Sequence, residues 1–214
     1  MSFPPGFAHH PLYFDPGQQA ALIDAVAAGV RQAPFFQPTM PRTGAPLSVV
    51  MSNFGPLGWV ADRAGGYRYQ DTHPVTGAPW SPMPEQLTEL WRDVTDWPDP
   101  PDACLINWYR AEADGGRGAK MGYHVDRDEA EPNAPVVSVS LGDPALYRIG
   151  GAMRGGPTQG VKLFSGDVVV LADEARRCHH AVTKVFYGES ALVPKGGRIN
   201  LTMRRATFSV RSTA

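Results

Sequence analysis

The sequence predicts a mainly β fold with a few helices, arranged as a single domain over residues 1–214. The chain has 23 Gly and 21 Pro, and its apolar runs are short. This combination favours many brief strands joined by turns over a helical bundle. Hydrophobic residues make up 43% of the chain and charged residues 19%, a composition that can bury one core.

Two helices are expected within the first hundred residues. Asp15 can cap the first, Pro16 suits its first turn, and apolar side chains recur at helical spacing through residues 17–32. The second, residues 84–97, has the same spacing and stops at a Pro-Asp-rich stretch. The segment between them is rich in Pro, Gly and aromatic residues, with one strand-like piece at 47–52. We interpret this segment as a lobe that covers the rest of the fold.

The remainder of the chain is expected to form strands. Short apolar or alternating runs separated by turn residues predict eight of them, at residues 103–109, 121–125, 136–141, 145–149, 161–164, 168–171, 180–185 and 199–208. Strands of this length and spacing are typical of a sandwich of two sheets. The segment 111–118 between two of these strands is expected to be a loop without chemistry.

Charge and cysteine content limit the function classes. The net charge is −1, but residues 148–205 hold ten Lys or Arg against four acids, a local net of +6; such a cluster is either a solvated face or a site for anions. Cys104 and Cys178 form no C-x-x-C pair, so neither a disulfide framework nor a thiolate zinc site is expected. Without an apolar stretch of roughly 18 residues or a signal-like start, the chain is expected in the cytoplasm.

Metal-ligating side chains occur in one compact motif and at one later position. His124 and Asp126 are two residues apart, so on a strand both point to one face. His180, at the start of a later strand, completes a set of two imidazoles and one carboxylate, as in non-haem Fe(II) oxygenases. A zinc hydrolase remains an alternative, and the adjacent His179 is an alternative third ligand.

Residues 198–204 alternate strictly between polar and apolar side chains, with Arg198 and Arg204 on one face. In an exposed edge strand that face would simply be solvated. In a cleft, a buried Arg would require an anionic partner, and a guanidinium suits a carboxylate because it donates two parallel hydrogen bonds. Asn107 and Tyr109, again two residues apart, can add donors to the same ligand.

Taken together, these residues resemble the AlkB family of iron(II)- and 2-oxoglutarate-dependent nucleic-acid demethylases, especially its bacterial members. The resemblance covers nearly the whole chain, with matching segments at residues 47–53, 57–59, 101–109, 124–129, 137–142, 165–170 and 198–204. It implies a double-stranded β-helix, or jelly roll, at residues 101–210. It further implies flanking helices and a nucleotide-recognition lid within residues 1–100.

The resemblance also implies the co-substrates and the residues that bind them. His124, Asp126 and His180 hold Fe(II) as the catalytic centre, and 2-oxoglutarate and O2 take its open positions. The distal carboxylate of 2-oxoglutarate is bound by Arg198, Asn200 and Tyr109, while the chelating end lies near Asn107 and Arg204. Oxidative decarboxylation gives succinate and CO2, and the hydroxylated N-methyl group leaves as formaldehyde.

The implied substrate is 1-methyladenine or 3-methylcytosine in DNA, with RNA as a further candidate, handled by a monomer. A base inside a duplex must be flipped out to reach a buried metal. The expected substrate-binding residues are Met51, Trp59, Tyr67, Tyr69, Asp128 and Arg154. The three aromatic residues form the clamp, unless they pack within the lid, and Asp128 favours a cationic ring. Phosphates are assigned to Arg154 with Arg176, Arg177 and Arg205.

Some features leave alternatives open. Leu171 stands where bacterial relatives have Trp, so the substrate pocket is expected to differ from theirs. A 2-oxoglutarate oxygenase acting on a protein or small molecule would share the metal and co-substrate residues and differ only in the lid. A metal-binding or nucleic-acid-binding module without turnover is the remaining alternative.

Overall fold

The computed structural model describes residues 2–112 and 118–208, so part of the expected loop 111–118 lies outside the described residues. The larger of its two main sheets has six strands, and every neighbouring pair is antiparallel. In spatial order these strands are β1 (Phe7–His10), β10 (Val168–Leu171), β7 (Val136–Gly142), β12 (Arg198–Arg204), β5 (Ala103–Tyr109) and β2 (Val50–Phe54).

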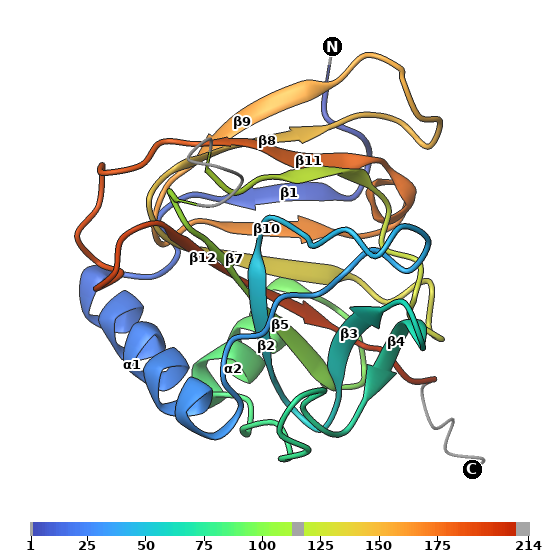
Figure 1. Ribbon diagram of the computed structural model, residues 1–214. Coiled ribbons are helices and arrows are strands. Elements are labelled where there is room, and N and C mark those ends of the chain that lie inside the picture. Colours follow the sequence, from blue (N-terminus) through green and yellow to red (C-terminus); the bar gives the residue numbers. More distant parts are fainter. Residues whose placement is uncertain (1, 113–117, 209–214) are drawn as a thin grey trace.

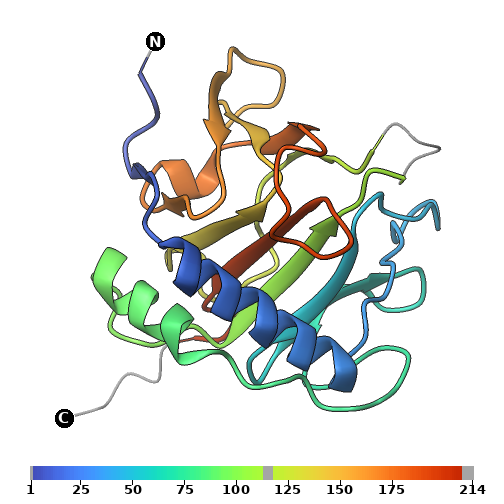
Figure 2. The ribbon, with the colours of Figure 1, turned by 90° about the vertical axis from the view of Figure 1, so that its left-hand side faces the viewer.

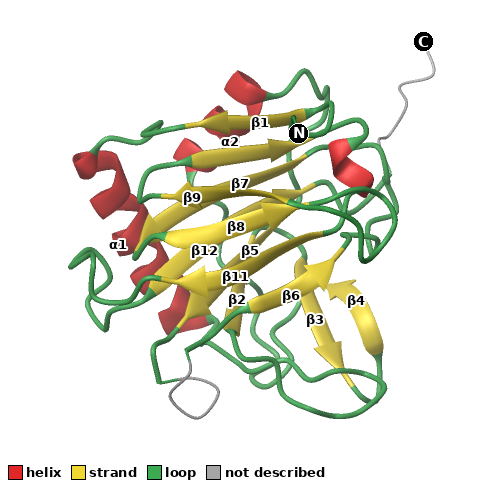
Figure 3. Cartoon of the chain, turned by 90° about the horizontal axis from the view of Figure 1, so that it is seen from above, coloured by secondary structure: helices red, strands yellow, loops and turns green. Residues whose placement is uncertain are grey.

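A four-stranded antiparallel sheet faces the first (Figures 1 and 3). Its order is β6 (Met121–His124), β11 (His180–Val185), β8 (Ala145–Ile149) and β9 (Gln159–Leu163). Apolar side chains of both sheets, among them Leu105 and Val169 from one and Tyr147 and Val182 from the other, pack into one buried cluster. Two antiparallel sheets enclosing a shared interior confirm the jelly roll.

Both helices lie on the outer face of the larger sheet (Figure 2). The first, α1 (Pro16–Gln32), starts with a capping box, in which Asp15 and Gln18 each accept a hydrogen bond from the other's backbone N–H. The second, α2 (Glu85–Val94), ends three residues earlier than the sequence predicted, because Thr95 is extended and its N–H closes the last turn on Trp91 O. Neither helix has the length and hydropathy needed to cross a membrane.

Strand β12 packs against the helix layer with one face and lines the interior cavity with the other. Its apolar residues Ile199, Leu201 and Met203 join the cluster that packs under the helices. Because side chains alternate across a strand, the polar residues of β12 point to the opposite face, which is the interior between the sheets. All seven residues are buried and β12 lies between β5 and β7, so the exposed-edge alternative is wrong.

The lobe before α2 contains structure that the sequence pattern did not reveal. A hairpin of β3 (Gly58–Asp62) and β4 (Gly66–Gln70) forms a separate two-stranded sheet, turning at Gly66 with φ of 71°. Strand β1 was also missed, and β2 begins at Val50 instead of residue 47. At the other end of the chain, β12 stops at Arg204 instead of 208, because Asp102 captures the Ala206 and Thr207 backbone N–H groups.

Candidate active site

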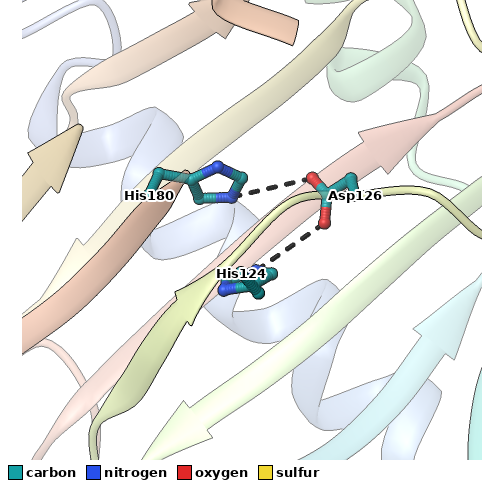
Figure 4. A group of neighbouring side chains, drawn as sticks. All are labelled: His124, Asp126 and His180. Carbon is teal, nitrogen blue, oxygen red and sulfur yellow. Dashed lines mark ion pairs between the residues drawn. The ribbon is translucent and has the colours of Figure 1, made fainter. Parts of the chain in front are cut away.

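The three expected metal ligands converge between the two sheets (Figure 4). His124 ends β6 and His180 begins β11, and the two residues are direct partners in the strand pairing. Asp126 lies two residues after the end of β6. Its Oδ1 is 3.7 Å from His124 Nε2, and its Oδ2 is 3.7 Å from His180 Nε2. One ligand atom from each residue lies within 4.8 Å of the others, which is close enough for a single ion.

Backbone carbonyls orient both imidazoles. Nδ1 of His124 lies 2.8 Å from Gly122 O, and Nδ1 of His180 lies 3.2 Å from Cys178 O. Because a carbonyl only accepts, Nδ1 is the donor in each hydrogen bond, and this leaves Nε2 of each ring to face the site, as a metal ligand requires. Burial lowers the pKa of His180 to about 4, so its ring is neutral. His179 is outside this cluster, near Gly151 O, which confirms His180 as the third member.

Asp126 is ionised although it is buried. Burial opposes ionisation, but the nearby guanidiniums, Arg204 above all, outweigh it and hold the pKa of Asp126 below its usual range. Arg204 Nη2 donates to Asp126 Oδ1 at 2.7 Å. Two imidazoles and one carboxylate, all on one side of the site, form a donor set that fits Fe(II) and leaves the opposite side open.

Arg198 places a second buried charge, a guanidinium, in the space between the two sheets. The side chain is 1% exposed, and burial lowers its pKa. Nη2 donates to Ser140 Oγ at 2.9 Å, whereas Nε and Nη1 have no partner among the described residues. A buried guanidinium with unused donors calls for an anion. Arg198 and the three ligands line one cavity of about 530 Å³, so a dicarboxylate such as 2-oxoglutarate fits the residues present.

Comparison with known proteins agrees with this geometry. Residues 6–204 match the model of the 2OG-Fe(II) oxygenase superfamily. The chain is 52% identical over 204 residues to an alpha-ketoglutarate-dependent dioxygenase AlkB homolog of Caulobacter vibrioides, covering 94% of this chain and 88% of the relative. It is 41% identical over 189 residues to the alpha-ketoglutarate-dependent dioxygenase AlkB of Escherichia coli, covering 86% and 83%. The chain belongs to the AlkB family of 2OG-Fe(II) oxygenases.

A solved structure of OsALKBH1 extends the AlkB likeness to the fold. It superposes with a TM-score of 0.74 at 28% identity, covering 95% of this chain and all of the other. As an AlkB-family member the chain is an Fe(II)- and 2-oxoglutarate-dependent dioxygenase that uses O2 (alpha-ketoglutarate is 2-oxoglutarate). The zinc hydrolase and the module without turnover are therefore wrong as alternatives.

The AlkB-family cavity brings together nearly all the residues singled out from the sequence. Its lining includes the metal ligands and the five expected co-substrate residues Asn107, Tyr109, Arg198, Asn200 and Arg204. The Tyr109 ring lies 5.6 Å from Arg198 Cζ, and Asn107 Oδ1 is buried without a partner in the described part of the chain. Asn200 Nδ2 already donates to Ser138 Oγ and Val139 O, so its contact with a carboxylate stays a prediction.

Most expected substrate residues line this cavity. Its lining includes Met51, Trp59, Tyr67, Asp128 and Arg154, as well as Leu171. Trp59 Nε1 donates to Asp128 Oδ2 at 2.7 Å, and its ring stacks on that of Tyr67 with centroids 5.7 Å apart. Met51 is buried, whereas Asp128 and Arg154 are exposed. Tyr69 is the exception, because it does not line the cavity.

Two residues near the metal ligands, Arg176 and Glu129, form a buried ion pair that the sequence did not suggest. Arg176 is 4% exposed and donates to Glu129 Oε2 at 2.9 Å, to Asp126 O and to Ala134 O. Its assignment to phosphates is therefore wrong, since a buried and fully engaged guanidinium cannot reach a nucleic-acid backbone. Glu129 also binds Arg204. Residue type alone does not distinguish a buried ion-pair partner from a surface charge, so no sequence signal was available.

Proposed function

We propose that this AlkB-family dioxygenase demethylates N-alkylated bases in nucleic acid, acting on 1-methyladenine and 3-methylcytosine in DNA and, as a further substrate, in RNA. The observation that carries the proposal is the mouth of the cavity. There a stacked aromatic pair, Trp59 and Tyr67, lies beside the carboxylate of Asp128 and leads to the metal ligands. Aromatic faces hold an unstacked base, and a carboxylate favours a ring made cationic by N-methylation.

Bound iron, 2-oxoglutarate and O2 supply the oxidation that hydroxylates the N-methyl group, with succinate and CO2 as products and formaldehyde released afterwards. The residues of this chain bind 2-oxoglutarate and orient it. Arg198 and Tyr109, with Asn200, take the distal carboxylate. Arg204 and Asn107 lie at the chelating end, where Arg204 Nε and Asn107 Oδ1 are buried without partners among the described residues.

The proposed path of the nucleic-acid strand follows from the depth of the metal ligands and from the positive charges near the cavity. The ligands lie in an interior cavity lined by both sheets, so a base must leave its stack to reach them. Arg154, exposed at the cavity rim, is proposed to meet a phosphate next to that base. Arg177 and Arg205 remain candidates for more distant phosphates. We further propose a lid within residues 1–100 over a core at 101–210, supported by Trp59 and Tyr67 lining a cavity whose metal ligands come from the core.

The enzyme is proposed to act as a monomer in the cytoplasm. Both of its cysteines, Cys104 and Cys178, are buried and free, which agrees with a reducing compartment. Gel filtration of the purified chain, with and without a methylated oligonucleotide, tests the monomer.

The test of the function uses oligonucleotides that carry one 1-methyladenine or one 3-methylcytosine, as single and double strands of DNA and RNA. Mass measurement should show loss of one methyl group, with equimolar formaldehyde, only when Fe(II), 2-oxoglutarate and O2 are all present. An unmethylated strand and the Asp126→Ala variant are the controls. Succinate formation that no oligonucleotide stimulates would instead favour a protein or small-molecule substrate and contradict the proposal.

A further inference from the structure

Two neighbouring hydrogen bonds fasten the β3–β4 hairpin to the segment that carries the metal ligand Asp126. Trp59 Nε1 donates to Asp128 Oδ2 at 2.7 Å, and the Tyr69 hydroxyl donates to Glu129 Oε1 at 2.6 Å. Trp59 and Tyr69 are paired across the hairpin, and the two acids are consecutive in the chain. The hairpin is therefore attached at two adjacent points.

These two attachments differ in their surroundings. Asp128 is exposed at the mouth, where an entering base would meet it, whereas Glu129 is only 7% exposed. Burial raises the pKa of Tyr69 well above its ordinary value, although Arg204 acts in the opposite direction, so the hydroxyl keeps the proton that it donates. An entering base that contacts Asp128 therefore leaves the inner bond, between Tyr69 and Glu129, undisturbed.

The inner attachment leads directly to the metal ligand. Arg204 Nη1 donates to Glu129 Oε1 at 2.9 Å and to the Tyr69 hydroxyl at 3.1 Å, while Nη2 donates to Asp126 Oδ1 at 2.7 Å. Arg176 holds the other carboxylate oxygen of Glu129. The carboxylates and guanidiniums of this network are buried, Tyr69 is half-buried, and every one of these groups is hydrogen-bonded. Such networks hold their members rigidly.

We propose that Tyr69 is a positioning residue that keeps the base-holding hairpin in register with the iron ligand Asp126. This inference rests on the proposed function, since the hairpin holds a base only if the substrate is nucleic acid. Tyr69 then acts through Glu129 and Arg204 and does not touch the base. Without its hydroxyl, the base would lie off the metal, and 2-oxoglutarate would be consumed without matching removal of methyl groups.

The test compares Tyr69→Phe with Tyr13→Phe. Tyr13 also donates to a carboxylate at 2.6 Å, that of Asp93, but in the helix layer outside the cavity. With a methylated oligonucleotide and with ascorbate as reductant, we expect formaldehyde formed per succinate to fall at least about tenfold in Tyr69→Phe, the scale of a lost charged hydrogen bond. Tyr13→Phe should match the wild type. If both products of Tyr69→Phe fall in step, Tyr69 is merely structural and the inference is overturned.

A second measurement needs no turnover. Hydrogen exchange of the metal-free protein should accelerate about tenfold in residues 58–70 and 124–129 of Tyr69→Phe, and not in Tyr13→Phe. Unchanged exchange in 124–129 would overturn the link between hairpin and ligand, whatever the substrate is. If the exchange result holds but the wild type releases no formaldehyde from any methylated strand, the proposed function fails and the link between hairpin and ligand stands.

Discussion

His124 and His180 are direct partners in neighbouring antiparallel strands, and their ring centroids lie 4.4 Å apart. The backbone pairing of β6 and β11 therefore sets the spacing of two of the three ligands. Sites built on strands are held more rigidly than sites built on loops. Only Asp126 lies beyond a strand, and buried ion pairs hold it instead.

Stability of the metal-free protein should depend on pH through His180. The pKa of His180 is 6.5 in the unfolded chain and about 4 in the folded chain, because burial disfavours the charged ring. Between these values the unfolded state holds more protons, so stability is lost as pH falls from 6.5 toward 4. The loss should reach about 3 kcal/mol below pH 4, at about 1.4 kcal/mol per pKa unit, and about 2 kcal/mol of it should be present at pH 4.5. Urea unfolding at pH 7 and 4.5 measures it, and His180→Gln should flatten the dependence.

Asp126→Ala should affect both the metal and the fold. Removing the carboxylate deletes a ligand and leaves Arg204 Nη2 without its 2.7 Å partner. We expect Fe(II) binding to be lost in titration calorimetry and the metal-free protein to be destabilised by about 2 kcal/mol. His124→Ala is the matched control, since His124 is half-buried and holds no ion pair with an arginine among the residues that the structure describes. It should lose iron with little loss of stability, and equal destabilisation of both variants would contradict this account.

Arg198→Met should separate stability from co-substrate binding. The guanidinium is buried and makes no ion pair with a carboxylate in the described part of the chain, so an apolar side chain of similar length should leave the unfolding free energy unchanged or raise it. The affinity for 2-oxoglutarate should fall at least about 100-fold, because a buried charged partner worth roughly 3 kcal/mol or more is lost. Denaturant unfolding and 2-oxoglutarate titration check the two halves. A clear loss of stability would show that the charge is compensated within the chain.

Trp59→Phe should weaken substrate binding and leave the co-substrate unaffected. The phenyl ring keeps an aromatic face next to Tyr67 but cannot donate to Asp128. We expect KM for a methylated oligonucleotide to rise about tenfold, the scale of one hydrogen bond to a charged group, with KM for 2-oxoglutarate unchanged. Trp59→Ala should raise it further, because stacking contributes about 1–3 kcal/mol per base. Steady-state kinetics with both substrates varied would decide, and an equal rise in both KM values would exclude a role confined to the base.

The sequence predicted those parts of the site that lie on regular strands. Strict alternation at 198–204 placed Arg198 and Arg204 on one face, and the spacing of His124 and Asp126 placed two ligands together, because strand geometry repeats every two residues. The β3–β4 hairpin was missed, since Gly and aromatic residues obscure any period there. The contacts of Tyr69 and Arg176 could not be foreseen, because they join segments distant in sequence through side chains alone.

Because one face of β12 packs in the core and the other lines the cavity, an error in its strand pairing would affect both. A slip of one residue in its pairing with β5 and β7 would turn the guanidiniums toward the helices and the aliphatic side chains toward the interior. Such a misfolded chain would lose its packing and its co-substrate pocket in the same event. A molecule of unaltered sequence that folds tightly enough to resist proteases should therefore also be competent to bind 2-oxoglutarate, so a proteolysis assay of a partly misfolded sample would measure its binding-competent fraction.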